Sequence, residues 1–322
     1  MLMGRPNIDY LRVSVTDRCN LRCVYCNPLE QQGLTNHATI LRADEICRII
    51  RLCVDLGVTR VRLTGGEPLV RPDIVGLVRK LADIGGITDL SLTTNGILLA
   101  SMVQALKDAG LQRINVSLDA TEDEYFLRLT GSDEFARVMN GIEKALAVGL
   151  APVRINCVVL RALNLSQVAN LAEMTLNLPI SMRFIEYCPP SATVGQTDWY
   201  VSNDEVRRLV ESRLGALSPA APTRTSGPAV YFRARNALGT IGFISGRSST
   251  FCNWCSRLRL TCDGLLRPCL HRSKQYPLGR LLRSGASDGA LLSLIDRAFR
   301  EKSRYTKSDT TSECFSMQHM GG

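Results

Sequence analysis

Three cysteines near the N-terminus, Cys19, Cys23 and Cys26, have the type and spacing of metal ligands. A [4Fe–4S] cluster held by three thiolates keeps one iron without a protein ligand, and that iron can bind a small molecule and pass it an electron. A zinc site is the alternative, but it usually takes four protein ligands when it is structural. The nearest histidine, His37, lies eleven residues beyond Cys26. The spacing therefore favours an open iron–sulfur cluster.

A second group of cysteines lies in the C-terminal third of the chain, at Cys252, Cys255 and Cys269, with Cys262 between them. By spacing alone these four could hold a structural zinc ion. Between them, Arg257 and Arg259 alternate with apolar residues, so that on a strand both arginines would share one face. Guanidinium groups match phosphate geometry. The pattern therefore indicates an anionic ligand beside a metal site.

The composition describes an ordinary globular protein of 322 residues, 45% hydrophobic and 21% charged, with a formal charge of +9. No apolar run approaches the ~20 residues of a membrane span, and residues 1–6 lack the apolar core of a secretory signal. We therefore expect a soluble, cytoplasmic protein without a membrane partner. In that reducing compartment, clustered cysteines favour metal over disulfides. Arginine is scattered and aromatics are only 6%, which argues against a nucleic-acid groove and suits a polyanionic small substrate.

Short apolar runs alternate with helical patterns over most of the chain. The predicted strands span 11–15, 60–63, 89–93, 113–118, 152–160 and 181–187, and the predicted helices lie near 43–56, 72–83, 98–109, 133–148, 166–177 and 203–213. Six such units predict an α/β fold, a partial (β/α)6 TIM-like barrel, because a complete barrel needs eight. A Pro/Ser/Gly-rich linker is expected at 215–228.

After that linker we predict a smaller α+β region that covers the open side of the barrel. Its strands are expected at 230–233, 240–244 and 258–261, with a helix at 289–301. The predicted domains are therefore 1–228 and 229–322.

Polar motifs follow the first four predicted strands. The cysteine triplet follows the first, Gly65-Gly66-Glu67-Pro68 the second, Thr93 lies at the end of the third, and Ser117 at the end of the fourth. Each alone could be a turn or a helix cap. Because the carboxyl ends of parallel strands meet on one rim, their shared position indicates a site.

With Tyr25 just before its last cysteine and the Gly-Gly-Glu-Pro segment after it, the triplet resembles the radical S-adenosylmethionine superfamily. There the methionine part of S-adenosylmethionine binds the open iron, and electron transfer releases a 5′-deoxyadenosyl radical. Within the superfamily, essentially the whole chain resembles the GTP 3′,8-cyclases, which begin molybdenum cofactor biosynthesis. This likeness includes Arg-Phe-Ile-Glu-Tyr at 183–187, the C-terminal cysteines and a terminal Gly-Gly.

The resemblance implies a role for each matching position. The implied cluster ligands are Cys19, Cys23 and Cys26 for one [4Fe–4S] cluster and Cys252, Cys255 and Cys269 for a second, leaving Cys262 out. The implied S-adenosylmethionine contacts are Tyr25, Gly66, Ser117 and Cys188. The implied GTP contacts are Arg12, Arg62, Thr93, Arg154, Arg257, Leu258 and Arg259, and the implied catalytic residues are Arg257, Arg259, Gly321 and Gly322.

Two of these positions depart from the family pattern. Arg154 stands where the family has a lysine at the GTP phosphates, so positive charge is kept but a point charge becomes a planar fork. Cys188 stands where a methionine contacts S-adenosylmethionine. A backbone contact would survive that change, whereas a thioether contact would not.

The implied reaction begins with hydrogen abstraction from ribose C3′ of GTP, followed by bonding to guanine C8. The implied product is (8S)-3′,8-cyclo-7,8-dihydroguanosine 5′-triphosphate. The resemblance also implies a flavodoxin- or ferredoxin-like electron donor, transfer of the product to cyclic pyranopterin monophosphate synthase, a homodimer and no nucleic-acid partner. Two alternatives remain: another radical enzyme with an auxiliary cluster, such as a peptide-modifying one, and a zinc-stabilised nucleic-acid-binding module.

Overall fold

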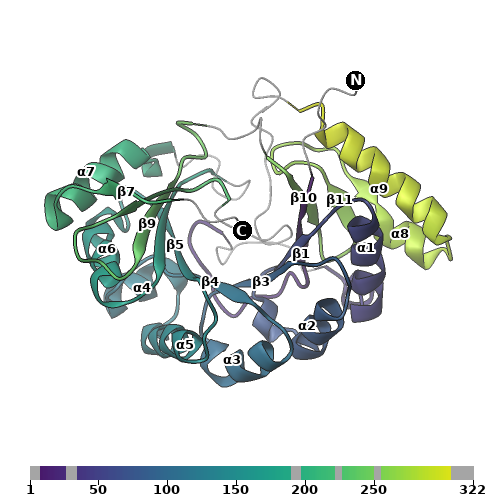
Figure 1. Cartoon of the computed structure of the whole chain (residues 1–322), viewed down its shortest axis with the longest axis horizontal. Coiled ribbons are helices and arrows are strands. Elements are labelled where there is room, and N and C mark those ends of the chain that lie inside the picture. The colour runs from purple at the N-terminus through teal and green to yellow at the C-terminus, as the bar shows by residue number, and fades with distance from the viewer. Residues whose placement is uncertain (1–7, 27–34, 190–196, 222–226, 250–254, 306–322) are drawn as a thin grey trace.

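A single strongly curved sheet organises the molecule. The computed structural model describes residues 8–26, 35–189, 197–221, 227–249 and 255–305. In these ranges it contains a 12-stranded sheet in the order β12-β11-β10-β1-β2-β3-β4-β5-β6-β9-β8-β7. The strands from β10 to β9 in this order all run parallel, and the helices cover the outer face of the curve (Figure 1). The predicted α/β partial barrel is therefore confirmed.

The first six strands occupy the middle of the sheet. They are β1 (Tyr10–Ser14), β2 (Arg60–Thr64), β3 (Asp89–Thr94), β4 (Arg113–Ser117), β5 (Val153–Val159) and β6 (Ser181–Glu186). The helices between and after them are α1 (Ala43–Asp55), α2 (Ile74–Ala82), α3 (Leu99–Asp108), α4 (Asp123–Thr130), α5 (Phe135–Ala147), α6 (Val168–Asn177) and α7 (Asn203–Leu214). All six predicted strands and all six predicted helices are present. The sequence prediction missed α4, a short helix whose buried residues are only Phe126, Leu129 and Thr130.

The C-terminal region extends this sheet at both edges. It contributes β8 (Val230–Arg233), β9 (Thr240–Ile244), β10 (Arg257–Leu260), β11 (Leu265–Arg267), β12 (Tyr276–Pro277), α8 (Leu278–Arg283) and α9 (Asp288–Lys302), while β7 (Ser218–Pro219) precedes it in the chain. Strand β9 pairs with β6 and β10 pairs with β1, both parallel. The two parts of the chain therefore share one sheet, which the prediction of a covering region did not foresee.

The predicted linker at 215–228 is partly wrong. Its residues Ser218–Pro219 form β7, which pairs antiparallel with β8 across the proposed boundary at residue 228. Apart from this short strand, the described part of the segment contains no helix or strand, and α7 ends just before it at Leu214. Residue 228 remains our proposed domain boundary in sequence.

Side chains on the central strands alternate between two environments. On β1, Leu11 and Val13 are fully buried in the core beneath the helices, whereas Arg12 and Ser14 face the inside of the curve. The same alternation places apolar residues of β2 to β5 against the helices. The inner face is therefore polar. Within the described ranges, no helix combines the length and apolar character needed to cross a membrane.

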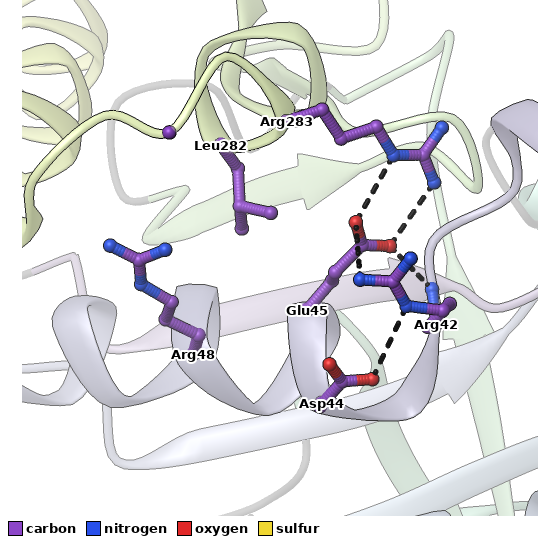
Figure 2. A pocket seen from close by; sticks show the side chains of 7 residues that line it. Arg42, Asp44, Glu45, Arg48, Leu282 and Arg283 are labelled. Carbon is purple, nitrogen blue, oxygen red and sulfur yellow. Dashed lines mark hydrogen bonds and ion pairs between the residues drawn. The ribbon is translucent and has the colours of Figure 1, made fainter.

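Charged pairs hold the C-terminal helices against α1 (Figure 2). Glu45, only 2% exposed, accepts hydrogen bonds from Nε and Nη2 of Arg283, each 3.1 Å long. Arg48 on the same helix donates to Asp288 at 2.7 Å. The surface pocket in Figure 2 is lined by Arg42, Asp44, Glu45, Arg48, Leu282, Arg283 and Gly285. Because its arginines are all ion-paired, we assign this pocket a structural role.

Candidate active site

The first cysteine group lies on a loop at the carboxyl end of β1. Backbone hydrogen bonds join this loop to the last turn of α4, from Arg22 N to Thr130 O (2.9 Å) and from Val24 N to Leu129 O (3.0 Å). The Tyr25 hydroxyl donates to Asp119 just beyond β4 (2.6 Å). The loop is therefore fixed by elements distant in sequence.

The three thiols of this loop share a buried environment that is poor in positive charge. Burial raises the pKa of Cys19, and it raises the pKa of Cys26 to about 12. The pKa of Cys23 lies well above its usual value because of burial and because of the charges of Cys26 and Asp119. A bound cation reverses this preference and stabilises thiolates. The donor set therefore fits a metal cluster. Within the described ranges, no three His, Cys, Asp or Glu side chains are close enough together to hold a single metal ion.

The Gly-Gly-Glu-Pro segment lies directly against this loop. A Cβ atom on Gly66 would lie 2.3 Å from the carbonyl oxygen of Arg18, so only glycine fits without movement. Glu67 accepts hydrogen bonds from Thr94 Oγ1 (2.7 Å) and Asn95 N (2.7 Å), and burial raises its pKa to about 7. The ends of β1, β2 and β3 are thereby joined on one rim, as the sequence predicted.

Replacing Gly66 with alanine should destabilise this junction and weaken S-adenosylmethionine binding. Overpacking of a tight contact costs about 1–3 kcal/mol, and the backbone that approaches the cysteine loop must shift. Chemical denaturation and equilibrium dialysis of the anaerobic protein measure the two effects.

Gly76→Ala is the matched control. Gly76 lies within α2, where an added Cβ meets nothing within 4 Å. Alanine there should stabilise the protein by about 0.5–1 kcal/mol. Equal behaviour of the two variants would refute the steric role of Gly66.

Arginines dominate the inner face of the sheet. Arg12 lies opposite Arg62 of β2 and Arg259 of β10 in the strand register. The described arginines on this face are Arg12, Arg60, Arg62, Arg113, Arg154, Arg183, Arg257, Arg259 and Arg267. Two carboxylates pair with members of this set, Asp9 with Arg60 and Asp89 with Arg113. Among the described residues, the arginines on this face therefore outnumber the carboxylates that pair with them.

Burial and mutual repulsion make this charge costly. Burial lowers the pKa of Arg12 well below its usual value, and Arg259 lowers it further. Burial likewise lowers the pKa of Arg62, Arg154, Arg183 and Arg259 to about 10. The Nε atom of Arg12 has no hydrogen-bond partner among the described residues. A polyanionic ligand would supply both the missing partner and the missing negative charge.

Tyr10 lies among these arginines and was not predicted from the sequence. The guanidinium carbons of Arg60 and Arg62 lie 5.1 and 5.5 Å from the centre of its ring. Burial would raise the pKa of its hydroxyl, but the charges of Arg62, Arg12 and Arg257 outweigh burial and lower it. This buried hydroxyl, like Arg12 Nε, has no partner in the described part of the chain.

The β10–β11 hairpin brings two cysteines of the second group together. Arg259 pairs with Arg267 in the antiparallel register, so continuing it by two residues places Cys269 opposite Arg257, next to Cys255. Both thiols act on the pKa of Arg259. Burial would raise the pKa of Cys255, but Arg257 and Lys302 outweigh burial and lower it. This site lies at the amino end of β10.

Cys262 lies beyond the opposite, carboxyl end of β10. It is 1% exposed, its sulfur lies 3.9 Å from Thr35 Oγ1, and burial and Asp17 help raise its pKa to about 12. Strand β10 thus separates Cys262 from Cys255. This placement supports leaving Cys262 out of the second ligand set. The first cysteine group follows the carboxyl end of β1, and Cys255 of the second group lies at the amino end of β10. The two groups therefore lie at opposite ends of these parallel strands, with the arginines between them.

The remaining predicted residues lie in different places. Ser117 ends β4, and Thr93 Oγ1 accepts a hydrogen bond from Asn115 on the inner face. Cys188 is half-buried just after β6. The Leu258 side chain is fully buried in the outer core, so only its backbone could reach a ligand between the strands. Cys252, Gly321 and Gly322 lie outside the described residues.

Sequence reasoning missed several polar residues of this face. They are Tyr10, Arg60, Arg113, Asn115, Asn156 and Arg183. Arg183 is 4% exposed and donates to Asn156 Oδ1 at 2.5 Å. The signal that could have found them is the i, i+2 repeat of polar residues along each strand, as in Tyr10 and Arg12, Arg60 and Arg62, or Arg113 and Asn115.

Comparisons with known proteins agree with this arrangement. Residues 13–175 match the model of the radical SAM superfamily, and residues 180–308 match that of Molybdenum Cofactor Synthesis C. A GTP 3′,8-cyclase from Pelotomaculum thermopropionicum is 45% identical over 92% of this chain and 91% of its own length. One from Desulforamulus reducens is 42% identical over 98% of both chains.

A solved structure shows the same fold at low identity. Streptococcus suis SuiB bound to the precursor peptide SuiA superposes with a TM-score of 0.69 at 19% identity, covering 98% of this chain and 72% of that one. The family is decided by the sequence matches, which are more than twice as similar and span almost the full length of both chains. The chain belongs to the GTP 3′,8-cyclase family of the radical S-adenosylmethionine superfamily.

Proposed function

We propose that this chain converts GTP to (8S)-3′,8-cyclo-7,8-dihydroguanosine 5′-triphosphate, the first step of molybdenum cofactor biosynthesis. The observation that carries the proposal is the buried arginine face between two cysteine groups at opposite ends of the same strands. Such a face suits a nucleoside triphosphate. The GTP 3′,8-cyclase relatives and the molybdenum cofactor domain match support the same reading.

The arginines would hold the substrate by its phosphates. Arg12 and Arg62 lie side by side on β1 and β2, and Arg259 flanks Arg12 on β10. Arg154 is 1% exposed and keeps the positive charge of the family's lysine, so we propose that it binds phosphate through a planar fork. These fixed, desolvated charges would orient the ribose and exclude water from the reacting atoms.

The rim residues would hold the cofactors. Membership of the radical S-adenosylmethionine superfamily implies one [4Fe–4S] cluster and S-adenosylmethionine, which together supply one-electron radical chemistry when bound. Cys19, Cys23 and Cys26 are the proposed ligands of that cluster. Gly66 backbone, Tyr25 and Ser117 are the proposed S-adenosylmethionine contacts, with Cys188 contributing its backbone.

At the other end, we assign a second [4Fe–4S] cluster to Cys252, Cys255 and Cys269, with guanine beside it. Arg257, Arg259 and the backbone of Leu258 adjoin that site. Thr93, near the carboxyl end of β3, is proposed to contact GTP from the inner face of the sheet. We also propose that the terminal Gly321 and Gly322 enter the active site. A flavodoxin- or ferredoxin-like electron donor, delivery of the product to cyclic pyranopterin monophosphate synthase and a homodimer complete the proposal.

Anaerobic reconstitution tests the whole assignment. The protein should bind about eight irons, twice the content of one [4Fe–4S] cluster, and should form the cyclised nucleotide from GTP, S-adenosylmethionine and a reductant. Formation of 5′-deoxyadenosine without dependence on GTP would instead support a peptide-modifying or other radical enzyme. Bound zinc without absorbance near 400 nm would support the nucleic-acid-binding alternative.

A further inference from the structure

Asp119 connects the first cysteine loop to the strands behind it. It lies two residues beyond the end of β4 and is 5% exposed. Its Oδ2 accepts the hydrogen bond from the Tyr25 hydroxyl (2.6 Å), and its Oδ1 accepts one from Val158 N of β5 (2.8 Å). Its backbone oxygen accepts a further bond from Asn164 Nδ2 (3.0 Å). Asp119 therefore has a single position, set by β4, β5 and the segment before α6.

Tyr25 is held equally firmly. Its side chain is 9% exposed and lies between two proposed cluster ligands, Cys23 and Cys26, in sequence. The neighbouring Val24 N bonds to Leu129 O at the end of α4 (3.0 Å). The Tyr25–Asp119 bond is thus the side-chain contact that joins the centre of the loop to β4.

Asp119 also brings negative charge to the thiols. Burial raises its pKa to about 6, against the hydrogen bonds from Tyr25 and Val158, so the carboxylate is ionised at neutral pH. Asp119 lies close enough to Cys23 and Cys26 for its charge to act on both sulfur atoms. At the other cysteine group the balance is opposite, because Arg257 and Lys302 act on Cys255. A carboxylate therefore lies near the first group, whereas two cations lie near the second.

We propose that Asp119 is a positioning residue that holds Tyr25 and the cysteine loop in place and lowers the reduction potential of the first cluster below that of the second. A cluster gains one negative charge on reduction, and a fixed carboxylate nearby opposes that gain. A low potential makes the reduced cluster a stronger electron donor to S-adenosylmethionine. The comparison between clusters rests on the proposed function, whereas the effect of Asp119 on the first cluster requires only the superfamily's cluster.

Redox titration of the anaerobic holoenzyme, followed by electron paramagnetic resonance without GTP, tests this role. The first cluster is identified by the change that S-adenosylmethionine causes in its signal. Asp119→Asn should raise its midpoint potential by about 59 mV, a tenfold change in the reduction equilibrium, and leave the second cluster unchanged. Tyr25→Phe keeps the carboxylate, so it should shift the potential less while weakening S-adenosylmethionine binding.

Two further variants make each outcome decisive. Asp123→Asn removes an exposed charge from the first turn of α4 and should leave the potential unchanged. If Asp119→Asn fails to hold the first cluster, retention in Asp119→Glu supports the role of the charged acceptor, and loss in both overturns it. An unchanged potential in Asp119→Asn with the cluster intact also overturns it. If Asp119→Asn shifts the potential of the first cluster but the wild-type protein forms no cyclised nucleotide, the proposed function is refuted and the role of Asp119 is not.

Discussion

Replacing Cys255 with alanine should abolish formation of the cyclised nucleotide and lower bound iron from about eight to about four per chain. Cys255 lies at the amino end of β10 near Arg257, and Cys269 follows the paired strand β11 by two residues. Loss of one of three ligands leaves a cluster that two thiolates cannot retain. Iron and sulfide analysis of anaerobically reconstituted protein measures this directly, and the first cluster serves as the internal standard.

Cys262→Ala is the matched control for this variant. Cys262 lies in the same hairpin, but beyond the other end of β10, packed near Thr35. Its replacement should keep about eight irons and the activity, with at most a modest loss of stability from the buried thiol. Loss of the second cluster in this variant would show that Cys262 is a ligand and that the assignment of Cys252, Cys255 and Cys269 is wrong.

The elements of the central sheet could be predicted because their signals are local. Each strand is a short stretch with apolar residues at alternate positions, and α1 shows the 3.6-residue spacing of Ile46, Ile49 and Ile50 before it ends near Gly57. The edge pairings could not be predicted in this way. Strand β10 joins β1 across more than 240 residues of chain, and no local pattern states which edge it will meet.

The same distinction applies to the site. The cysteine spacings and the Gly-Gly-Glu-Pro segment could be recognised because their members are neighbours in sequence. Asp119 and Tyr25 meet only because α4 and β5 support both of them, 94 residues apart in the chain. At Leu258 the resemblance implies a GTP contact, but strand alternation turns its side chain into the core, so the contact that we propose there uses the backbone.

Replacing Arg12 with methionine should weaken GTP binding about 100-fold, or ~2.7 kcal/mol, and should make the ligand-free protein more stable. Arg12 is 8% exposed, faces Arg62 and Arg259, and has an Nε without a partner among the described residues. Its lowered pKa means that the folded protein binds this proton less tightly than the unfolded chain does. The charge therefore opposes folding at neutral pH, and replacing such buried charges by apolar residues of similar size can stabilise by about 1–4 kcal/mol.

Calorimetric titration with GTP and thermal unfolding without it separate these two effects. Arg235→Met, which removes an exposed arginine after β8, should change neither the GTP affinity nor the melting temperature of the ligand-free protein. In the wild type, inorganic tripolyphosphate should raise the melting temperature, because a ligand that binds only the folded state stabilises it, and Arg12→Met should reduce that rise. A variant that melts lower without ligand, or that keeps its GTP affinity, would contradict the assignment. The expected pattern would mean that the unneutralised positive charge on this face destabilises the ligand-free protein and is retained because it binds a polyanion.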